Sequence, residues 1–156
     1  MADPNWDRGM DIDVPAKPTH GNWTQAVDYV DAAKRLKFVV DDERPDPAAA
    51  VQPARMPNKW NYAQDRACAA DGDPKAPINP ANCLIPDAPP GALIAKIGGS
   101  TAGKTGDGVK SFVVGSFCVI DIDDKTKGTV YLTMNADPMG LLDRTGQLRV
   151  KVYRSG

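Results

Sequence analysis

Short apolar stretches bounded by turn residues recur in the C-terminal part of the chain, and in the last of them, QLRVKVY, apolar and polar residues alternate cleanly. This two-residue period is typical of β-strands with one buried face. The pattern predicts strands at 92–97, 111–122, 129–135 and 147–153, separated by Gly-rich or Asp-rich turns. Gly115, inside the second stretch, suggests a β-bulge. Short strands punctuated by turns in this way predict an all-β sandwich or barrel.

The segment WTQAVDYVDAAKRLKFVV, residues 23–40, is open to two interpretations. Helical spacing relates four of its apolar residues, Val27, Val30, Ala33 and Leu36. The bulky residues of RLKFVV, however, favour a strand. We therefore expect two strands, 23–29 and 35–40, joined by a turn at 31–34.

Two segments rich in proline lack a sustained apolar period. Residues 1–22 predict an extended N-terminal arm, held to the body by Trp6 or Ile12. Residues 41–90 predict a long structured loop, and such loops are often functional. Residues 23–156, which include this long loop, are expected to form a single domain.

Composition supports this all-β interpretation and excludes several classes of protein. Asp outnumbers Glu 19 to 1, and Asp favours caps and turns over helix interiors. The net charge of −1 lacks the electrostatic footprint of a nucleic-acid-binding protein. No apolar run is long enough to span a membrane, and the first residues lack a signal-peptide core. We expect a cytoplasmic protein at synthesis, although specialised secretion routes would leave no trace here.

The three cysteines leave one unpaired in any disulfide scheme. Cys118 lies in an apolar run and is expected to be a small buried hydrophobe. Cys68 and Cys83 flank a loop of fourteen residues and could form a disulfide in an oxidising compartment. Two cysteines at this spacing and the single histidine, His20, do not predict a zinc site.

The segment GGSTAGKT, residues 98–105, matches the phosphate-loop pattern G-x-x-x-x-G-K-[ST]. A true phosphate loop opens a helix whose N-terminal amides hold the phosphates. Here the sequence continues as GDGVKSFVV, and only residues 106–110 precede the next strand, too few for a crossover helix. We therefore predict a Gly-rich hairpin loop with Lys104 and Lys110 exposed.

The sequence gives little support for catalysis. A Ser–His–Asp set or a Cys–His pair would need His20, which lies in the N-terminal arm. Asp121 and Asp123 could share one sheet face, but such a pair is more typical of a solvated strand end than of a glycosidase. We expect no enzyme activity.

The loop NADPMGLLDRTG, residues 135–146, collects oxygen donors. It offers the side chains of Asn135, Asp137 and Asp143, and the carbonyl of Gly140. Hard oxygen ligands of this kind suit Ca²⁺, which takes six to eight of them. The same residue types also occur in ordinary turns, so the composition is compatible with a calcium site or with a plain loop.

Four stretches of the C-terminal half resemble the bacterial LecA-like (PA-I type) galactophilic lectins. They are CLIPDAPPGALIAKIGGS, VGSFCVIDI, GTVYLTMNADP and TGQLRVKV. The resemblance covers roughly residues 83–153. It implies a small jelly-roll-like β-sandwich in which one Ca²⁺ bridges the protein and two hydroxyls of galactose.

The metal ligands that the resemblance implies are Asp137, Gly140, Asp143 and, after the strand at 35–40, Asp46. Two of the four side-chain positions differ from the family in a way that does not suit calcium. Ala136 occupies the place of a calcium-binding Asp, and Arg144 that of an Asn ligand. A guanidinium has no lone pair for a cation, so Arg144 would instead pair with a neighbouring carboxylate.

Two functions follow as hypotheses. The first is a galactose-type carbohydrate-binding module, whose ligand would contact Asn135, Asp137, Asp143, Arg144, Trp60 and Tyr62. The two aromatic residues could stack on a sugar or anchor the long loop in the core. The alternative is a protein-interaction or structural module that keeps the lectin fold without calcium or sugar. Either could form a homo-oligomer.

Overall fold

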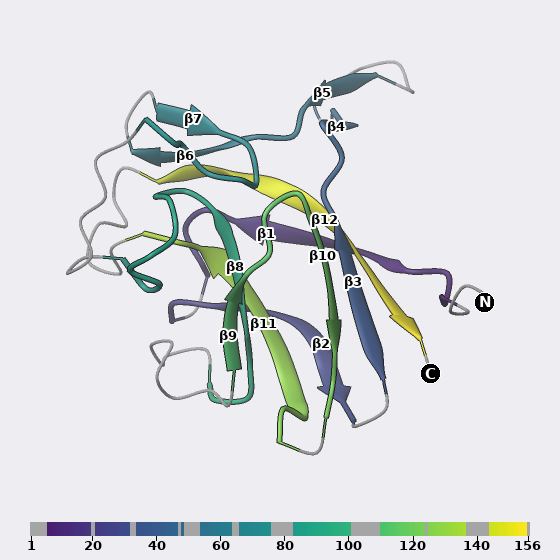
Figure 1. Ribbon diagram of the computed structural model, residues 1–156. Helices are drawn as coiled ribbons and strands as arrows, with labels where there is room; N and C mark the ends of the chain where they lie inside the picture. The colour runs from purple at the N-terminus through teal and green to yellow at the C-terminus, as the bar shows by residue number, and fades with distance from the viewer. Residues whose placement is uncertain are drawn as a thin grey trace.

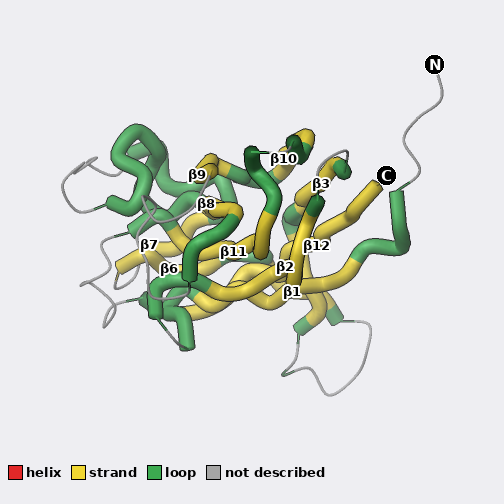
Figure 2. Tube along the Cα trace, turned by 90° about the horizontal axis from the view of Figure 1, so that it is seen from below, coloured by secondary structure: helices red, strands yellow, loops and turns green. Residues whose placement is uncertain are grey.

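The computed structural model describes residues 6–19, 21–31, 34–46, 48, 54–63, 66–75, 83–100, 110–123, 125–136 and 144–155. Within these ranges the chain forms strands, turns and loops and no helix (Figure 2). The strands are β1 (Met10–Pro15), β2 (Thr24–Val30), β3 (Arg35–Val39), β4 (Glu43–Pro45), β5 (Arg55–Pro57), β6 (Trp60–Ala63), β7 (Arg66–Cys68), β8 (Leu93–Ile97), β9 (Lys110–Val113), β10 (Phe117–Asp121), β11 (Gly128–Met134) and β12 (Thr145–Ser155). The all-β prediction is confirmed.

Two antiparallel sheets form a β-sandwich (Figure 1). The six-stranded sheet has the order β10-β3-β12-β6-β7, and β1 pairs with β12 along its other side. The four-stranded sheet has the order β2-β11-β8-β9. A short ribbon of β4 and β5 projects at the top of Figure 1.

The core lies between the two larger sheets. It combines inward side chains of the six-stranded sheet, such as Phe38 and Val150, with Leu93 and Leu132 of the four-stranded sheet, all fully buried. A second cluster covers the outer face of the four-stranded sheet, where Trp23, Leu84, Ile94 and Tyr131 pack together. β8 is therefore buried on both faces.

The predicted strand pair in 23–40 is confirmed by β2 and β3. The two strands do not pair with each other, because β2 belongs to the four-stranded sheet and β3 to the six-stranded sheet. The prediction of one strand over 111–122 is wrong. β9 and β10 also lie in different sheets, and the chain turns between them at Gly115, whose φ of 63° favours glycine.

The N-terminal arm predicted for residues 1–22 needs correction at its centre. Met10–Pro15 form β1, which pairs with β12 in continuous register from Met10↔Val152 to Pro15↔Gln147. Val14 of this strand is fully buried in the core. The alternating apolar residues bury one side of the strand, so the segment is part of the sandwich.

The long loop predicted for residues 41–90 contains four short strands, β4 to β7. Its anchor is Trp60, which is fully buried and donates a 2.8 Å hydrogen bond from Nε1 to the carbonyl of Gly91. Cys68 and Cys118 are free thiols in this structure, so the disulfide considered between Cys68 and Cys83 is not formed here. Cys118 is half-buried rather than enclosed.

The strands on either side of the phosphate-loop match are antiparallel neighbours. β8 pairs with β9 from Ile94↔Val113 to Ile97↔Lys110. This arrangement agrees with the predicted hairpin, because a phosphate-binding crossover helix would join parallel strands. Residues 101–109, with Lys104, lie outside the described part of the chain. No helix that could span a membrane occurs among the described residues.

Candidate functional site

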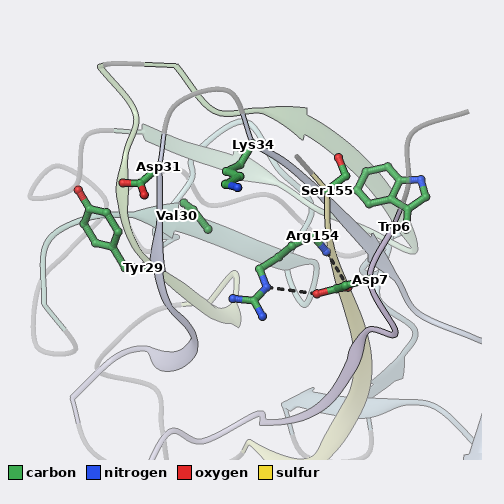
Figure 3. Close-up of a pocket in the computed structure, with 8 residues that line it drawn as sticks. All are labelled: Trp6, Asp7, Tyr29, Val30, Asp31, Lys34, Arg154 and Ser155. Atoms are coloured by element: carbon green, nitrogen blue, oxygen red, sulfur yellow. Dashed lines mark hydrogen bonds and ion pairs between the residues drawn. The ribbon is translucent and has the colours of Figure 1, made fainter.

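A surface groove of about 370 Å³ lies where the ends of β2 and β12 meet the start of β3. Trp6 forms one side of it and is held to the end of β12 by an isolated bridge to Ser155. Tyr29 lies on the opposite side, with Arg154 between the two aromatic residues (Figure 3). We refer to this site as the Trp6–Tyr29 groove.

The aromatic residues of the groove differ in how they are held. Tyr29 is 52% exposed, so one face of its ring is available to a ligand. Trp6 is half-buried, and the Nζ of Lys37 lies 4.6 Å from the centroids of both Trp6 and Tyr153. This cation–π contact on two rings fixes the position of the indole.

The polar side of the groove is the ion pair of Asp7 and Arg154, in which the carboxylate also accepts hydrogen bonds from backbone N–H groups. The Nε of Arg154 lies 3.3 Å from Oδ2 of Asp7, and the backbone N–H of Arg154 donates to Oδ1 at 3.0 Å. The N–H of Gly9 donates to the same oxygen at 3.0 Å. Partial desolvation raises the pKa of Asp7, but these hydrogen bonds outweigh it and lower the pKa below its usual value. The carboxylate is therefore charged at neutral pH.

The remaining charged residues in the described lining of the groove are Asp31 and Lys34, on the connection from β2 to β3. A guanidinium donates pairs of hydrogen bonds, either to neighbouring hydroxyls or to a carboxylate, and an ionised carboxylate accepts pairs of hydrogen bonds from neighbouring hydroxyls. Together with an exposed aromatic face they can hold a small molecule that is polar at its rim and apolar on its faces.

Asn135, predicted to contact a sugar, is fully buried and serves the fold. Its Oδ1 accepts a hydrogen bond from the N–H of Ile85 at 2.8 Å, and its Nδ2 donates to the carbonyls of Ile85 and Ala88 at 3.0 and 3.1 Å. The amide holds the 83–91 loop. The structure thus gives Asn135 a role in the fold, and its contact with a sugar stays a prediction.

Trp60, Tyr62 and Arg144 lie apart from the groove. Trp60 is fully buried and offers no face for stacking, which corrects its assignment as a sugar platform. Arg144 is 4% exposed and its Nη1 donates to the carbonyl of Ala16 at 3.3 Å, so it is enclosed beside β1 rather than presented to a ligand. Tyr62 is half-buried, and its hydroxyl donates to Asp73 at 2.6 Å.

The predicted calcium ligands Asp137, Gly140 and Asp143 lie outside the described residues. Asp46 lies at the end of β4, where its Oδ1 accepts a hydrogen bond from the N–H of Ala48 at 2.9 Å in a turn. No group of three or more His, Cys, Asp or Glu side chains that could hold a metal occurs within the described ranges. The calcium site stays a prediction.

Sequence reasoning missed the groove because its residues come from separate segments. Trp6, Tyr29 and Arg154 share no motif and meet only through the bridge to β12 and the crossing from β2 to β3. The one available signal was Tyr29, an aromatic residue at an outward position of a predicted strand. Comparison of the chain with protein-family models finds no match, and a search of curated proteins finds no similar sequence.

Proposed function

We propose that this protein is a non-catalytic carbohydrate-binding module and that the sugar binds in the Trp6–Tyr29 groove. The observation that supports the proposal is the exposed Tyr29 on one side of a groove and Trp6 on the other, with charged groups between them (Figure 3). A pyranose has apolar C–H faces and a hydroxyl rim, so both kinds of group have a partner on it. The groove volume of about 370 Å³ falls at the small end of ligand sites, as a mono- or disaccharide requires.

The guanidinium of Arg154 is the main recognition group in this proposal. Only its Nε bonds to Asp7, and neither terminal nitrogen has a hydrogen-bond partner among the described residues. Two donors in a fixed plane fit two neighbouring sugar hydroxyls. Asp7 holds the plane in place, and Asp31 supplies an acceptor at the other side of the groove.

The resemblance to galactophilic lectins suggests a different place for the sugar, the calcium loop at 135–146. Arg144 and Arg154 stand at opposite ends of the 11-residue strand β12. At ~3.3 Å per residue, the two candidate sites are roughly 30 Å apart. Variants in one site should therefore leave the other unaffected, and the two versions of the proposal can be separated.

The experiment is a galactose and oligosaccharide titration followed by NMR amide shifts, in chelator and then in millimolar calcium. We expect binding in chelator that is weakened at least tenfold by Tyr29→Ala and by Arg154→Met. The matched control is Phe117→Ala, another exposed aromatic residue, on β10 and outside the groove. Calcium-dependent binding that Tyr29→Ala leaves unchanged would move the sugar to the 135–146 loop. No binding of any saccharide would refute the function itself.

A second candidate function, protein association, is favoured by the edge strand β10. Phe117 is 62% and Val119 38% exposed on this strand, and β3 is its one partner among the described strands. The bonds from Val40 N to Ser116 O and from Ile122 N to Lys34 O show that the even-numbered residues bond to β3. By the antiparallel alternation, the odd-numbered residues direct their N–H and C=O groups outward.

A second copy of this chain fits that edge. A two-fold axis at Val119 would pair outward residues with outward residues, Phe117 with Asp121 and Val119 with itself. In this register no two residues of the same charge lie opposite each other. The charge of Asp121 is already balanced by Arg35, whose Nε lies 2.6 Å from its Oδ1. An exposed edge with apolar side chains is a template for such pairing.

The test of self-association is sedimentation analysis over a range of protein concentrations. We expect a dimer that Val119→Lys disrupts, since the axis would bring two lysines together. Val113→Lys, on the exposed edge strand β9, is the control and should leave the dimer intact. A monomer at all concentrations would rule out this candidate.

A further inference from the structure

A second pocket, of about 150 Å³, lies between the β4–β5 ribbon and the outer side of β1 and β12. Its lining is almost entirely charged, and the four basic residues are Arg44, Arg55, Arg149 and Lys151. Among the residues that the structure describes, it shares no lining residue with the Trp6–Tyr29 groove. Any role for it is therefore separate from the function proposed above.

The pocket is built on a buried amide that fixes the ribbon to β12. Asn58 is 2% exposed, and its Nδ2 donates to the carbonyls of Asp41 and Arg149 at 2.9 and 3.0 Å. Its Oδ1 accepts from the N–H of Arg149 at 2.9 Å, and its own N–H donates to Asp42. The basic residues are thus held by a rigid backbone, as a binding site needs.

Three of the four basic side chains have partners within the protein. Arg149 bonds to Asp13 through Nε at 3.0 Å and Nη2 at 3.3 Å, and Lys151 pairs with Asp41 at 3.3 Å. The Nη2 of Arg55 donates to the carbonyl of Glu43 at 2.9 Å. Arg149 and Lys151 are thus neutralised within the protein, and Arg55 is bonded to a backbone carbonyl.

Arg44 is the exception. Its side chain is among the buried charged groups, with the residue 9% exposed, and its Nε has no hydrogen-bond partner. Nor does Arg44 form an ion pair with any residue that the structure describes. Buried charges in proteins are normally paired, because desolvating an isolated ion is costly. The guanidinium at this pocket therefore lacks one negative partner.

We propose that this pocket binds a carboxylate group of a small molecule, with Arg44 as its bidentate partner. A single negative charge matches the net charge of +1 on the described lining, in which four basic residues stand against three acidic ones. The acidic residues Asp11, Asp41 and Glu43 also line the pocket and would repel a dianion such as phosphate or sulfate. The volume of about 150 Å³ admits the acid group and a few further atoms, so the rest of a larger ligand such as a sugar acid would extend out of the pocket.

The test compares thermal melts at pH 7 in sodium acetate, sodium galacturonate, sodium sulfate and sodium chloride at equal ionic strength. The wild-type protein should be stabilised by the carboxylates relative to chloride. At ten times Kd, the unfolding equilibrium constant falls by about elevenfold. Galactose serves as the neutral counterpart of galacturonate and separates recognition of the acid group from binding in the groove.

Arg44→Met keeps the apolar stem and removes the charge, and it should abolish the difference between carboxylate and chloride. Arg44→Lys should reduce that difference, because a lysine cannot bond in bidentate fashion. The matched control is Arg66→Met, an exposed arginine on β7 outside the pocket. The same carboxylate-dependent shift in wild type and Arg44→Met, or a larger shift with sulfate than with acetate in wild type only, would overturn the proposal.

Discussion

Asn135→Ala tests whether this side chain holds the fold or serves a ligand. In the structure its amide accepts from the N–H of Ile85 and donates to the carbonyls of Ile85 and Ala88, at 2.8 to 3.1 Å. Alanine removes the partner of all three groups in a buried environment. At about 1 kcal/mol for each hydrogen bond lost, the free energy of unfolding should fall by about 3 kcal/mol.

The effect should spread beyond the loop. Residues 83–91 include Leu84, which packs on Trp23, and Gly91, whose carbonyl accepts the indole N–H of Trp60. Urea unfolding followed by tryptophan fluorescence measures the loss directly. In a thermal melt, ~3 kcal/mol corresponds to a decrease of roughly 6–12 °C for a chain of this size.

A companion variant, Asn135→Asp, sharpens the test. The aspartate keeps an acceptor for the N–H of Ile85 but places a buried carboxylate against carbonyl oxygens. Burial and carbonyl contacts raise a carboxyl pKa. The loss of stability that comes from ionising this carboxyl group should therefore be absent below the unfolded pKa of about 4 and increase above it. A loss below ~1 kcal/mol in Asn135→Ala, or a pH-independent effect in Asn135→Asp, would refute this account of the loop.

Three further predictions address the backbone, an ion pair and a thiol. Gly72 and Gly146 both have a positive φ, but only at Gly72 would an added Cβ lie 2.9 Å from backbone atoms. In urea titrations, Gly72→Ala should therefore lower the free energy of unfolding more than Gly146→Ala. The contribution of Asp7 to stability should be present above about pH 4 and be lost as pH falls through its lowered pKa, so Asp7→Asn should flatten an acid-unfolding curve there. Burial raises the pKa of Cys68 to about 11, from 9.0. Near pH 8 the thiol should therefore react with disulfide reagents about 100-fold more slowly in the native state than in urea.

The sequence was sufficient to predict the fold class and the strands β2, β3, β8, β11 and β12, because each is an apolar stretch bounded by turn residues. It missed β1 and the short strands β4 to β7, which lie in the proline-rich segments. It predicted β2 and β3 correctly in spite of the helical spacing of Val27 and Val30. It failed at β9 and β10, where an apolar run continues through a change of sheet. The turn at Gly115 depends on a tertiary contact, the hydrogen bonds of its N–H and that of Val114 to Leu93. No local pattern records such a contact.

The candidate site was harder to predict for a related reason. Polar residues at a strand end were interpreted as ligands, yet Asn135 satisfies loop carbonyls that only the folded chain brings near it. Conversely, Arg44 and Arg154 look like ordinary surface arginines in the sequence. Whether each could bind a ligand depends on the partners that the fold supplies. The guanidinium of Arg44 is enclosed without a carboxylate, whereas that of Arg154 forms an ion pair with Asp7.

The position of β12 has a consequence for how the protein folds. This strand, Thr145–Ser155, supplies pairing partners to β1, β3 and β6 at once, and β1 lies more than 130 residues earlier in the chain. During synthesis, β1 has no strand partner until the segment that forms β12 has left the ribosome. Contacts over such sequence separations make folding slow, because the loop must close before the pairing stabilises it. A ribosome-bound fragment ending before Thr145 should therefore leave Ile12 and Val14 exposed and available to chaperones.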